Sequence, residues 1–216
     1  MAGDLITVKA LLKNNPDLVL STNNTGETSL HMAALRRLKD MVELLLASNA
    51  VVNARDSYGR TPLHDAVYQG MHMNDSDAAA SENRKALVEL LLAHKADLEA
   101  KDHLDMTPLL WAVAQGQQDM AELLLAHGAN VNATDNTGLT PLNSAAWGGY
   151  DGMVKFLLAH GAKVNTKDKK GKTPLENVVI SMCVGKVDPP KRYSDVVELL
   201  LAHGANVNAR ENGVVS

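Results

Sequence analysis

One six-residue string recurs along this chain and constrains its fold more than any other feature. VELLLA occurs at residues 42–47, 88–93 and 197–202, and the close variants AELLLA and VKFLLA occur at residues 121–126 and 154–159. Self-similarity at a fixed period is typical of repeat architectures, in which each unit buries its apolar face against its neighbours. We therefore expect an array of similar units.

A second recurring string sets the length of the unit. Thr-Pro-Leu occurs four times, and Thr-Ser-Leu is a weaker fifth copy; these strings begin at Thr28, Thr61, Thr107, Thr140 and Thr173. Aligning both strings gives steps of 33, 46, 33 and 33 residues, with insertions at 71–83 and 183–192. We divide the chain, as a single domain, into a half repeat, five repeats and a tail, which are 1–22, 23–55, 56–101, 102–134, 135–167, 168–210 and 211–216.

Each repeat is predicted to form two short helices. The threonine can cap the first helix through its hydroxyl, and proline fits the first helical position because its missing N–H would be unpaired there. Three adjacent leucines, such as Leu123 to Leu125, cover most of the second helix, so neighbouring repeats must pack on more than one side of it. Asp-x-x-Gly, as in residues 135–138, predicts a tight turn into the next repeat. The expected fold class is an all-α solenoid of stacked helix-turn-helix units joined by β-turn or hairpin loops.

This pattern resembles the ankyrin repeat, a 33-residue unit with a β-turn and two helices around Thr-Pro-Leu-His-x-Ala. His31 and His64 match the histidine of that motif. The family's polar link between repeats is not expected where the motif has another residue, which is the case at Leu110, Asn143 and Glu176. Glycine is also replaced at three positions, namely the turn residue Asp105 and the helix-stop residues Asn49 and Lys95. A left-handed conformation at Lys95 is expected to cost about 1 kcal/mol.

Composition and charge exclude several classes of function. The net charge is −4 and the pI is about 6.0, which argues against a general affinity for nucleic acid. Residues 102–154 have a net charge of −6 and residues 155–216 have +4, which either steers a partner or is a solvated surface. Cys183 is the single cysteine, so no disulfide framework is expected. We find no transmembrane-length stretch or signal peptide, and predict a cytoplasmic protein without membrane contact.

Four histidines occupy the same position of successive repeats, at His94, His127, His160 and His203. Equivalent residues of stacked helices lie about 8–10 Å apart, whereas zinc ligands lie about 2 Å from one point. We therefore expect each histidine to contact carbonyl groups at a helix C-terminus. No nucleophile motif or phosphate-binding loop is present. The prediction is a non-enzymatic chain with no catalytic, metal or cofactor-binding residues.

The predicted function is protein binding. The resemblance implies a concave binding face made of turn tips and first helices, and several apolar residues occupy turns that would ordinarily be polar. The predicted partner-binding residues are Tyr58, Arg60, Tyr68, Gln69, His103, Leu104, Met106, Trp111, Gln115, Thr137, Leu139, Trp147, Lys169, Lys170 and Lys172. The basic run that contains the three lysines either binds acidic groups or is an exposed turn. The alternative hypothesis is a regulatory or targeting module of a larger enzyme or effector whose activity lies outside this chain.

The two ends and the two insertions depart from the regular repeat. Residues 3–22 match a repeat that begins at its midpoint, with residues 3–5 expected as the inter-helix turn, so its first helix is missing. Solenoids need polar caps, so we expect either a fragment of a longer protein or ends covered by a partner. A monomer is expected, with end-to-end self-association as an option. Both insertions fall between the two helices of their repeat and are either tolerated loops or a secondary site.

Overall fold

A computed structural model describes residues 2–68, 78–184 and 191–207. It divides into two compact units, residues 1–103 and 104–216, each treated by itself. Unit 1 contains α1 (Ala2–Asn14), the 3-10 helix η1 (Pro16–Leu20), α2 (Ser29–Leu35), α3 (Lys39–Ala47), α4 (Pro62–Val67) and α5 (Ala78–Ala93). Unit 2 contains α6 (Pro108–Ala114), α7 (Gln118–Ala126), α8 (Pro141–Gly148), α9 (Asp151–Ala159), α10 (Pro174–Val184) and α11 (Lys191–Ala202). No strand occurs in these described ranges, so the predicted all-α fold is confirmed.

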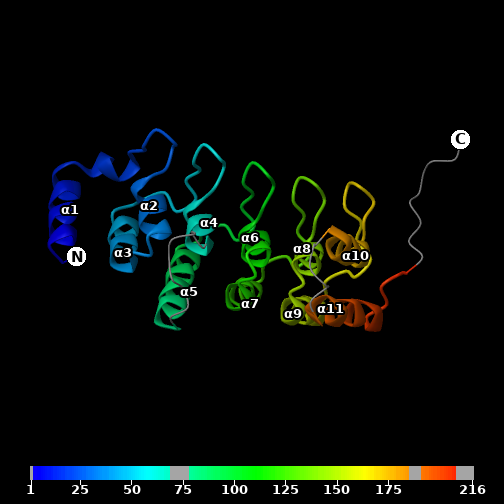
Figure 1. The fold of residues 1–216 in the computed structure, drawn as a ribbon. Coiled ribbons are helices and arrows are strands. Elements are labelled where there is room, and N and C mark those ends of the chain that lie inside the picture. The colour runs from blue at the N-terminus through cyan, green and yellow to red at the C-terminus, as the bar shows by residue number, and fades with distance from the viewer. Residues whose placement is uncertain (1, 69–77, 185–190, 208–216) are drawn as a thin grey trace, which may run out of the picture. The chain divides into compact units, whose positions relative to one another are not determined.

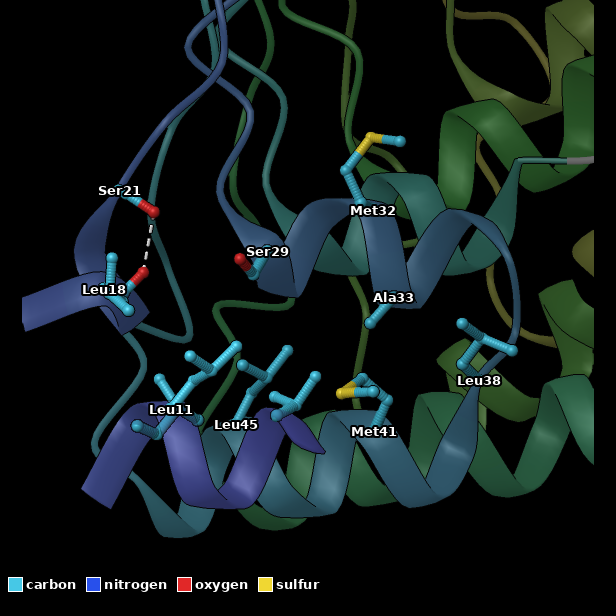
Figure 2. A pocket seen from close by; sticks show the side chains of 11 residues that line it. Leu11, Leu18, Ser21, Ser29, Met32, Ala33, Leu38, Met41 and Leu45 are labelled. Atoms are coloured by element: carbon cyan, nitrogen blue, oxygen red, sulfur yellow. Dashed lines mark hydrogen bonds between the residues drawn. The ribbon is translucent and has the colours of Figure 1, made fainter. Parts of the chain in front are cut away.

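Within each unit the repeats stack as predicted, first helix on first helix and second on second. In unit 1, α2 packs against α4, and α3 packs against both α1 and α5. In unit 2, α8 packs between α6 and α10, while α9 packs against α11. Each first helix also packs on the second helix of its own repeat, and in unit 2 the turns project away from the second helices (Figure 1). The leucine triplets therefore meet neighbours on several sides.

The helices begin where the recurring threonines stand. The hydroxyl oxygen of Thr140 accepts a hydrogen bond from the Asn143 N–H at 3.3 Å, and that of Thr107 accepts one from the Leu110 N–H at 3.3 Å. The proline that follows each of them occupies the first helical turn. The predicted threonine caps are confirmed at these positions.

The middle leucine of every full repeat's triplet forms the core. These side chains are 0–2% exposed and comprise Leu45, Leu91, Leu124, Leu157 and Leu200. Burying a leucine side chain stabilises the folded chain by about 1.5–3 kcal/mol. This single sequence position therefore places one buried leucine in the core of each full repeat.

Both insertions lengthen helices. α5 has 16 residues, whereas α3 and α7 have nine each, so the inserted segment continues the second helix as its sequence predicted. α10 has 11 residues against eight in α8. Residues 71–77 and the predicted non-helical excursion at residues 188–190 lie outside the described residues. At the N-terminus, α1 begins at Ala2, so residues 3–5 are helical rather than a turn.

Four residues other than glycine adopt left-handed backbone conformations. Asn49, Lys95 and Asp105 have φ angles of 65°, 65° and 57°, which confirms that they replace glycine without changing the backbone. Arg37, at φ 56°, occupies the inter-helix position that Gly116 and Gly149 hold in later repeats. The left-handed conformation of Arg37 was not predicted, because residues with a bulky side chain seldom adopt positive φ.

Replacing Lys95 with glycine is expected to stabilise the protein by about 1 kcal/mol, because glycine adopts positive φ without the Cβ clash. Urea unfolding of both proteins measures the difference. Gly128→Ala, at the same repeat position with a φ of 93°, is the reciprocal control and is expected to destabilise. An unchanged or lower stability for Lys95→Gly would show that the lysine conformation is not strained.

The motif histidine joins one repeat to the next. The Thr28 N–H donates to Nδ1 of His31 at 3.1 Å, which leaves Nε2 to donate to the Arg60 carbonyl at 3.1 Å. Desolvation of the ring lowers the pKa of His31 below its ordinary value, consistent with a neutral imidazole. Asn143 reproduces only the first half of this arrangement: its Oδ1 accepts from the Thr140 N–H at 3.2 Å, while its buried Nδ2 has no hydrogen-bond partner among the described residues. The predicted loss of the link at Asn143 is confirmed.

Replacing Asn143 with histidine is expected to add the missing link and to stabilise the protein by about 1 kcal/mol. The acceptor would be the Lys172 carbonyl, which precedes the next threonine as the Arg60 carbonyl does. Chemical denaturation measures the change, with Asn143→Ala as a destabilising control that removes the cap as well. A destabilised histidine variant would mean that the ring does not fit there.

Three of the four repeat-end histidines lie as predicted. Nδ1 lies within hydrogen-bond distance of the carbonyl four residues earlier in His94 (3.0 Å from Leu90), His160 (2.8 Å from Phe156) and His203 (2.8 Å from Leu199). His127 is exposed at the end of α7. Each of these carbonyls also accepts a hydrogen bond from the backbone N–H of the same histidine at 3.2 Å, so the ring adds a second contact at the C-terminus of the helix.

Candidate partner-binding surface

The turns between repeats are built by an aspartate and held by its side chain. Oδ1 of Asp135 accepts hydrogen bonds from the N–H groups of Thr137 at 2.8 Å and Leu139 at 2.9 Å. Oδ1 of Asp168 does the same for Lys170 and Lys172. The fourth residue of each turn has positive φ, which is 82° at Gly138 in the first of these turns. Sequence and geometry therefore give the turns one shared backbone shape.

Successive turns are joined by backbone hydrogen bonds in each unit. In unit 1, the Ser57 N–H donates to the Thr25 carbonyl at 2.9 Å, and the His103 N–H donates to the Tyr58 carbonyl at 2.9 Å. In unit 2, Asn136 donates to Leu104 and Lys169 donates to Thr137, both at 2.8 Å. These bonds fix the spacing of the turns, and the Ser57 hydroxyl adds a side-chain hydrogen bond to the Thr25 carbonyl at 2.7 Å.

The second and third residues of the turns that begin at Asp56, Asp102, Asp135 and Asp168 are exposed, whereas Thr25, the third residue of the first turn, is half-buried. In unit 1 they include Tyr58, which is 57% exposed, and His103, whose ring packs over Gly59. Arg60, the fifth residue of its turn, is partly buried and places its guanidinium 5.1 Å from the Tyr58 ring centroid. A guanidinium at this distance stabilises an aromatic ring by a cation–π interaction. Tyr58 is therefore an exposed aromatic side chain with a fixed neighbour.

Unit 2 also exposes side chains at its turn tips, but none of them is aromatic. Leu104 is 57% exposed at its turn tip, and the tips of the next two turns expose Thr137, Lys169 and Lys170. The fifth residues of these turns are partly buried, and they are Met106, Leu139 and Lys172. Because Met106 and Leu139 are half-covered, packing explains much of their apolar character.

The predicted partner-binding residues of the first helices lie within these helices or directly after their last residue. Tyr68 follows the last residue of α4 and is half-buried, as are Trp111 in α6 and Gln115 at the end of α6. Trp147 lies in the last turn of α8 and is 49% exposed. The Ser181 hydroxyl donates to its carbonyl at 3.0 Å, which anchors α8 to α10. Gln69 lies outside the described residues.

An ionic cluster beneath the Tyr58 turn was not predicted from sequence. Arg60 Nη2 lies 2.6 Å from Oδ2 of Asp56 and 3.4 Å from Oε1 of Glu27, while its Nη1 lies 3.7 Å from Oδ1 of Asp65. Asp65 is 1% exposed, and neither of its oxygens has a hydrogen-bond partner among the described residues. Three carboxylates thus share one guanidinium. This cluster could be predicted only from knowledge of how the two repeats stack.

The carboxylates of this cluster differ in pKa. Burial raises the pKa of Asp65 to about 7, because the attraction of Arg60 only partly offsets desolvation and Asp56 and Glu27 add repulsion. Burial alone would raise the pKa of Asp56, but hydrogen bonds from Arg60 and Tyr58 outweigh it and lower that pKa. The hydrogen bond from Asn23 lowers the pKa of Glu27. Asp65 is therefore the carboxyl of the cluster that holds a proton near neutral pH.

Two other features, a metal site and a membrane-spanning helix, are absent from the described part of the chain. No three His, Cys, Asp or Glu side chains of those residues come together in a way that could hold a metal ion. Among the same residues, no helix combines the length and apolar character needed to cross a bilayer. Apolar and basic side chains on rigid turns are the main chemical feature at the tips.

Tandem helix pairs joined by aspartate-glycine turns define a helical repeat protein. Comparison with known protein families specifies the repeat: residues 1–74 and 76–168 match the family model for ankyrin repeats in three copies, and residues 170–212 match a single ankyrin repeat. The chain therefore belongs to the ankyrin-repeat family, a family of protein-interaction modules.

Curated relatives match over shorter stretches. The chain is 45% identical over 67 residues to neurogenic locus notch homolog protein 1 of Xenopus laevis and 43% identical over 60 residues to the Notch protein of Drosophila melanogaster. It is 50% identical over 46 residues to notch homolog protein 1 of Homo sapiens. These matches cover 31%, 28% and 21% of this chain and 2% of each relative. The similarity is therefore confined to a small part of these relatives.

Proposed function

We propose that this chain is a non-enzymatic, cytoplasmic scaffold that binds a protein partner through its turn tips and first helices, the concave face in ankyrin proteins. The observation that supports this most is the exposure of Tyr58 and Leu104, each 57%, at positions where turns are ordinarily polar. Tyrosine and tryptophan are the residues that most often dominate binding energy at protein interfaces. Trp147, half exposed on α8, adds a second aromatic anchor.

The rigidity of the turns favours binding. Asp56 holds its turn through hydrogen bonds to the backbone of Tyr58 and Arg60, at 2.9 and 2.8 Å. Backbone bonds between turns hold each loop against the next. A side chain that is ordered before binding loses less conformational entropy when the partner arrives. The turn tips are therefore suited to recognition without prior rearrangement.

The alternative proposal is a regulatory or targeting module of a larger protein. The comparisons support it to this extent: in the notch relatives the matched region is a small share of a long chain. Under both proposals the contact is made by the same surface. They differ in whether further activity is covalently attached.

Substitution of the anchors tests the proposal. The bait Tyr58→Ala/Leu104→Ala/Trp147→Ala is expected to lose at least tenfold of a reproducible protein partner relative to the unchanged chain. The matched control is Val51→Ala/Leu201→Ala/Val207→Ala, which removes apolar residues that are 54%, 42% and 68% exposed outside the turn tips and the first helices. Quantitative affinity capture from the source cells, followed by a Kd measurement with the purified partner, provides the readout.

Both baits must first show unchanged helical circular dichroism. Equal capture by the unchanged chain, the anchor variant and the control would place binding away from the turn tips. Equal loss in both variants would show that scattered apolar exposure, not the proposed face, holds the partner.

A further inference from the structure

One turn of unit 2 concentrates positive charge at its tip. Lys169 and Lys170 are the second and third residues of the turn that begins at Asp168, and both are exposed, as is Lys167 directly before the turn. The same two positions of the other four turns contain no lysine or arginine. We call Lys167, Lys169 and Lys170 the lysine tip. Its turn, which precedes α10, stands beside the turn that precedes α8 (Figure 1), because the Lys169 N–H donates to the Thr137 carbonyl.

The carboxylates nearest to the lysine tip in sequence hold backbone groups instead of lysine side chains. Oδ1 of Asp168 accepts hydrogen bonds from the N–H groups of Lys170 at 2.9 Å and Lys172 at 2.8 Å. Oε2 of Glu176 accepts from the N–H and the hydroxyl of Thr173, at 2.7 and 3.0 Å. Among the described residues, no carboxylate forms an ion pair with the ammonium groups of the lysine tip. The charge of this patch is therefore not neutralised by the described part of the chain.

Cations beside the turns of unit 1 are bound by the fold. Arg55, at the repeat position of Lys167, donates through Nη1 to the carbonyls of Gly59 at 3.0 Å and Lys101 at 2.6 Å. Arg60 is shared by three carboxylates. These two arginines stabilise their turns, whereas the lysine tip adds charge without such a contact. Contacts within the fold therefore do not account for the lysine tip.

The rest of unit 2 narrows the class of partner. Residues 104–154 contain five Asp or Glu residues and no lysine or arginine. A nucleic acid carries negative charge along its whole length, so this part of the unit would repel it. A protein segment can instead carry its acidic residues at one end and apolar residues at the other. Leu104, which is 57% exposed at a tip two turns from the lysine tip, is suited to contact the apolar end.

The repeat spacing sets the distance between these two contacts. Stacked helices lie about 8–10 Å apart, so two steps separate the tips by about 16–20 Å. An extended chain spans about 3.3–3.6 Å per residue, so about five or six residues bridge that distance. The backbone hydrogen bonds from Asn136 to Leu104 and from Lys169 to Thr137 keep the three tips in one row.

We propose that the lysine tip binds an acidic segment of a protein partner, in which Asp or Glu residues contact Lys169 and Lys170 and an apolar residue about six positions away contacts Leu104. This inference rests on the proposed function, because it names the chemistry of the partner at the same surface. Ion pairs between exposed side chains are screened by salt. Binding of the segment therefore weakens as the ionic strength rises.

Two synthetic peptides serve as probes, because the segment can run in either direction. One has a leucine six residues before three consecutive glutamates, the other has it six residues after them, and glycine and serine fill the space between. In the control peptides glutamine replaces every glutamate. Fluorescence anisotropy of the labelled peptides with the full chain measures Kd at about 20 mM and about 150 mM salt. We expect saturable, salt-sensitive binding of at least one acidic peptide and about tenfold weaker binding of its glutamine control.

Substitutions at the lysine tip sharpen the test. Lys169→Asn/Lys170→Thr gives this turn the tip residues of the turn that begins at Asp135, so its backbone shape is kept. This variant is expected to weaken the acidic peptide about fivefold or more. The matched control is Lys155→Gln/Lys163→Gln, which removes the same charge from two exposed lysines of unit 2 outside the turn tips. It is expected to change Kd by less than about twofold, because these lysines do not contact the segment.

The apolar contact is tested separately with Leu104→Ala. This substitution is expected to weaken the acidic peptide about threefold and to leave unchanged the Kd of an acidic peptide that carries serine in place of leucine. Equal effects on both peptides would overturn the assignment of Leu104. All variants must retain the helical circular dichroism of the unchanged chain.

Three results would overturn the proposal. The first is equal affinity for the glutamate and glutamine peptides. The second is equal weakening by the two lysine variants, which would show only a general attraction between charges. The third is a single-stranded DNA oligonucleotide that binds through the lysine tip more tightly than either acidic peptide, because the patch would then recognise nucleic acid.

These failures are distinct from failure of the proposed function. If the peptides do not bind but the bait with Tyr58, Leu104 and Trp147 replaced still loses its partner, the acidic segment is wrong and the binding surface stands. If capture is equal for all baits, the proposed function fails whatever the peptides do.

Discussion

Replacing Leu142 with alanine is expected to lower the free energy of unfolding by about 2–5 kcal/mol. Leu142 is fully buried in α8, which packs against α6, α9 and α10, so the cavity would be enclosed by three helices. Because each repeat depends on its neighbours for its core, a defect in a central repeat weakens the stacking on both sides. Urea unfolding followed by circular dichroism measures the loss.

The control for this prediction is Leu201→Ala, which removes the same atoms from a side chain that is 42% exposed on α11. It is expected to cost about 0.5 kcal/mol or less. Similar losses in the two variants would contradict the burial pattern described above for unit 2.

Replacing Asp65 with asparagine is expected to stabilise the protein progressively as the pH rises from 4 to 8. Folding keeps a proton on Asp65 up to a pKa of about 7, against 3.8 in the unfolded chain. Between these values the folded state binds more protons than the unfolded state, so stability falls with rising pH. The full span corresponds to about 4 kcal/mol, an upper bound because water and the chain can relax around the charge. Asparagine removes this dependence.

The stability difference between the two proteins must be measured across the pH range. His31 titrates in the same range with the opposite sign, because its lowered pKa makes the fold lose stability as pH falls below 6.5. That contribution is common to both proteins and cancels in the difference. Asp56→Asn is a companion variant: repulsion from the Asp56 carboxylate raises the pKa of Asp65, so its removal should shift the loss of stability that Asp65 causes to lower pH. A constant difference for Asp65→Asn would exclude a raised pKa.

Much of the fold could be predicted from the sequence because the same motifs recur in every repeat. Each Thr-Pro-Leu and each leucine triplet is a weak signal alone, but their fixed spacing gave both helices, their caps and their stacking within each unit. Even the glycine replacements at Asn49, Lys95 and Asp105 kept the predicted backbone. Residues 71–77 and 185–190 lie outside the described structure, and these segments have no counterpart in other repeats from which to argue.

The candidate sites were harder to predict from the sequence than the fold. Spacing along the repeat predicted which residues stand on turns, but not that Met106 and Leu139 are half-covered while Tyr58 and Leu104 are open. Exposure depends on the neighbouring repeat, which differs in every case. The carboxylates around Arg60 were missed for the same reason, since Glu27 and Asp65 lie 38 residues apart in sequence and meet through stacking.

Backbone hydrogen bonds join successive turns, from the Ser57 N–H to the Thr25 carbonyl and from the Lys169 N–H to the Thr137 carbonyl, and the Ser57 hydroxyl adds a side-chain bond to the same Thr25 carbonyl. Replacing a tip side chain that makes none of these bonds, such as that of Lys169, leaves the backbone bonds between turns in place. Under the proposed function, mutations at such tip positions would change which partner is bound while the backbone frame of the turns is kept.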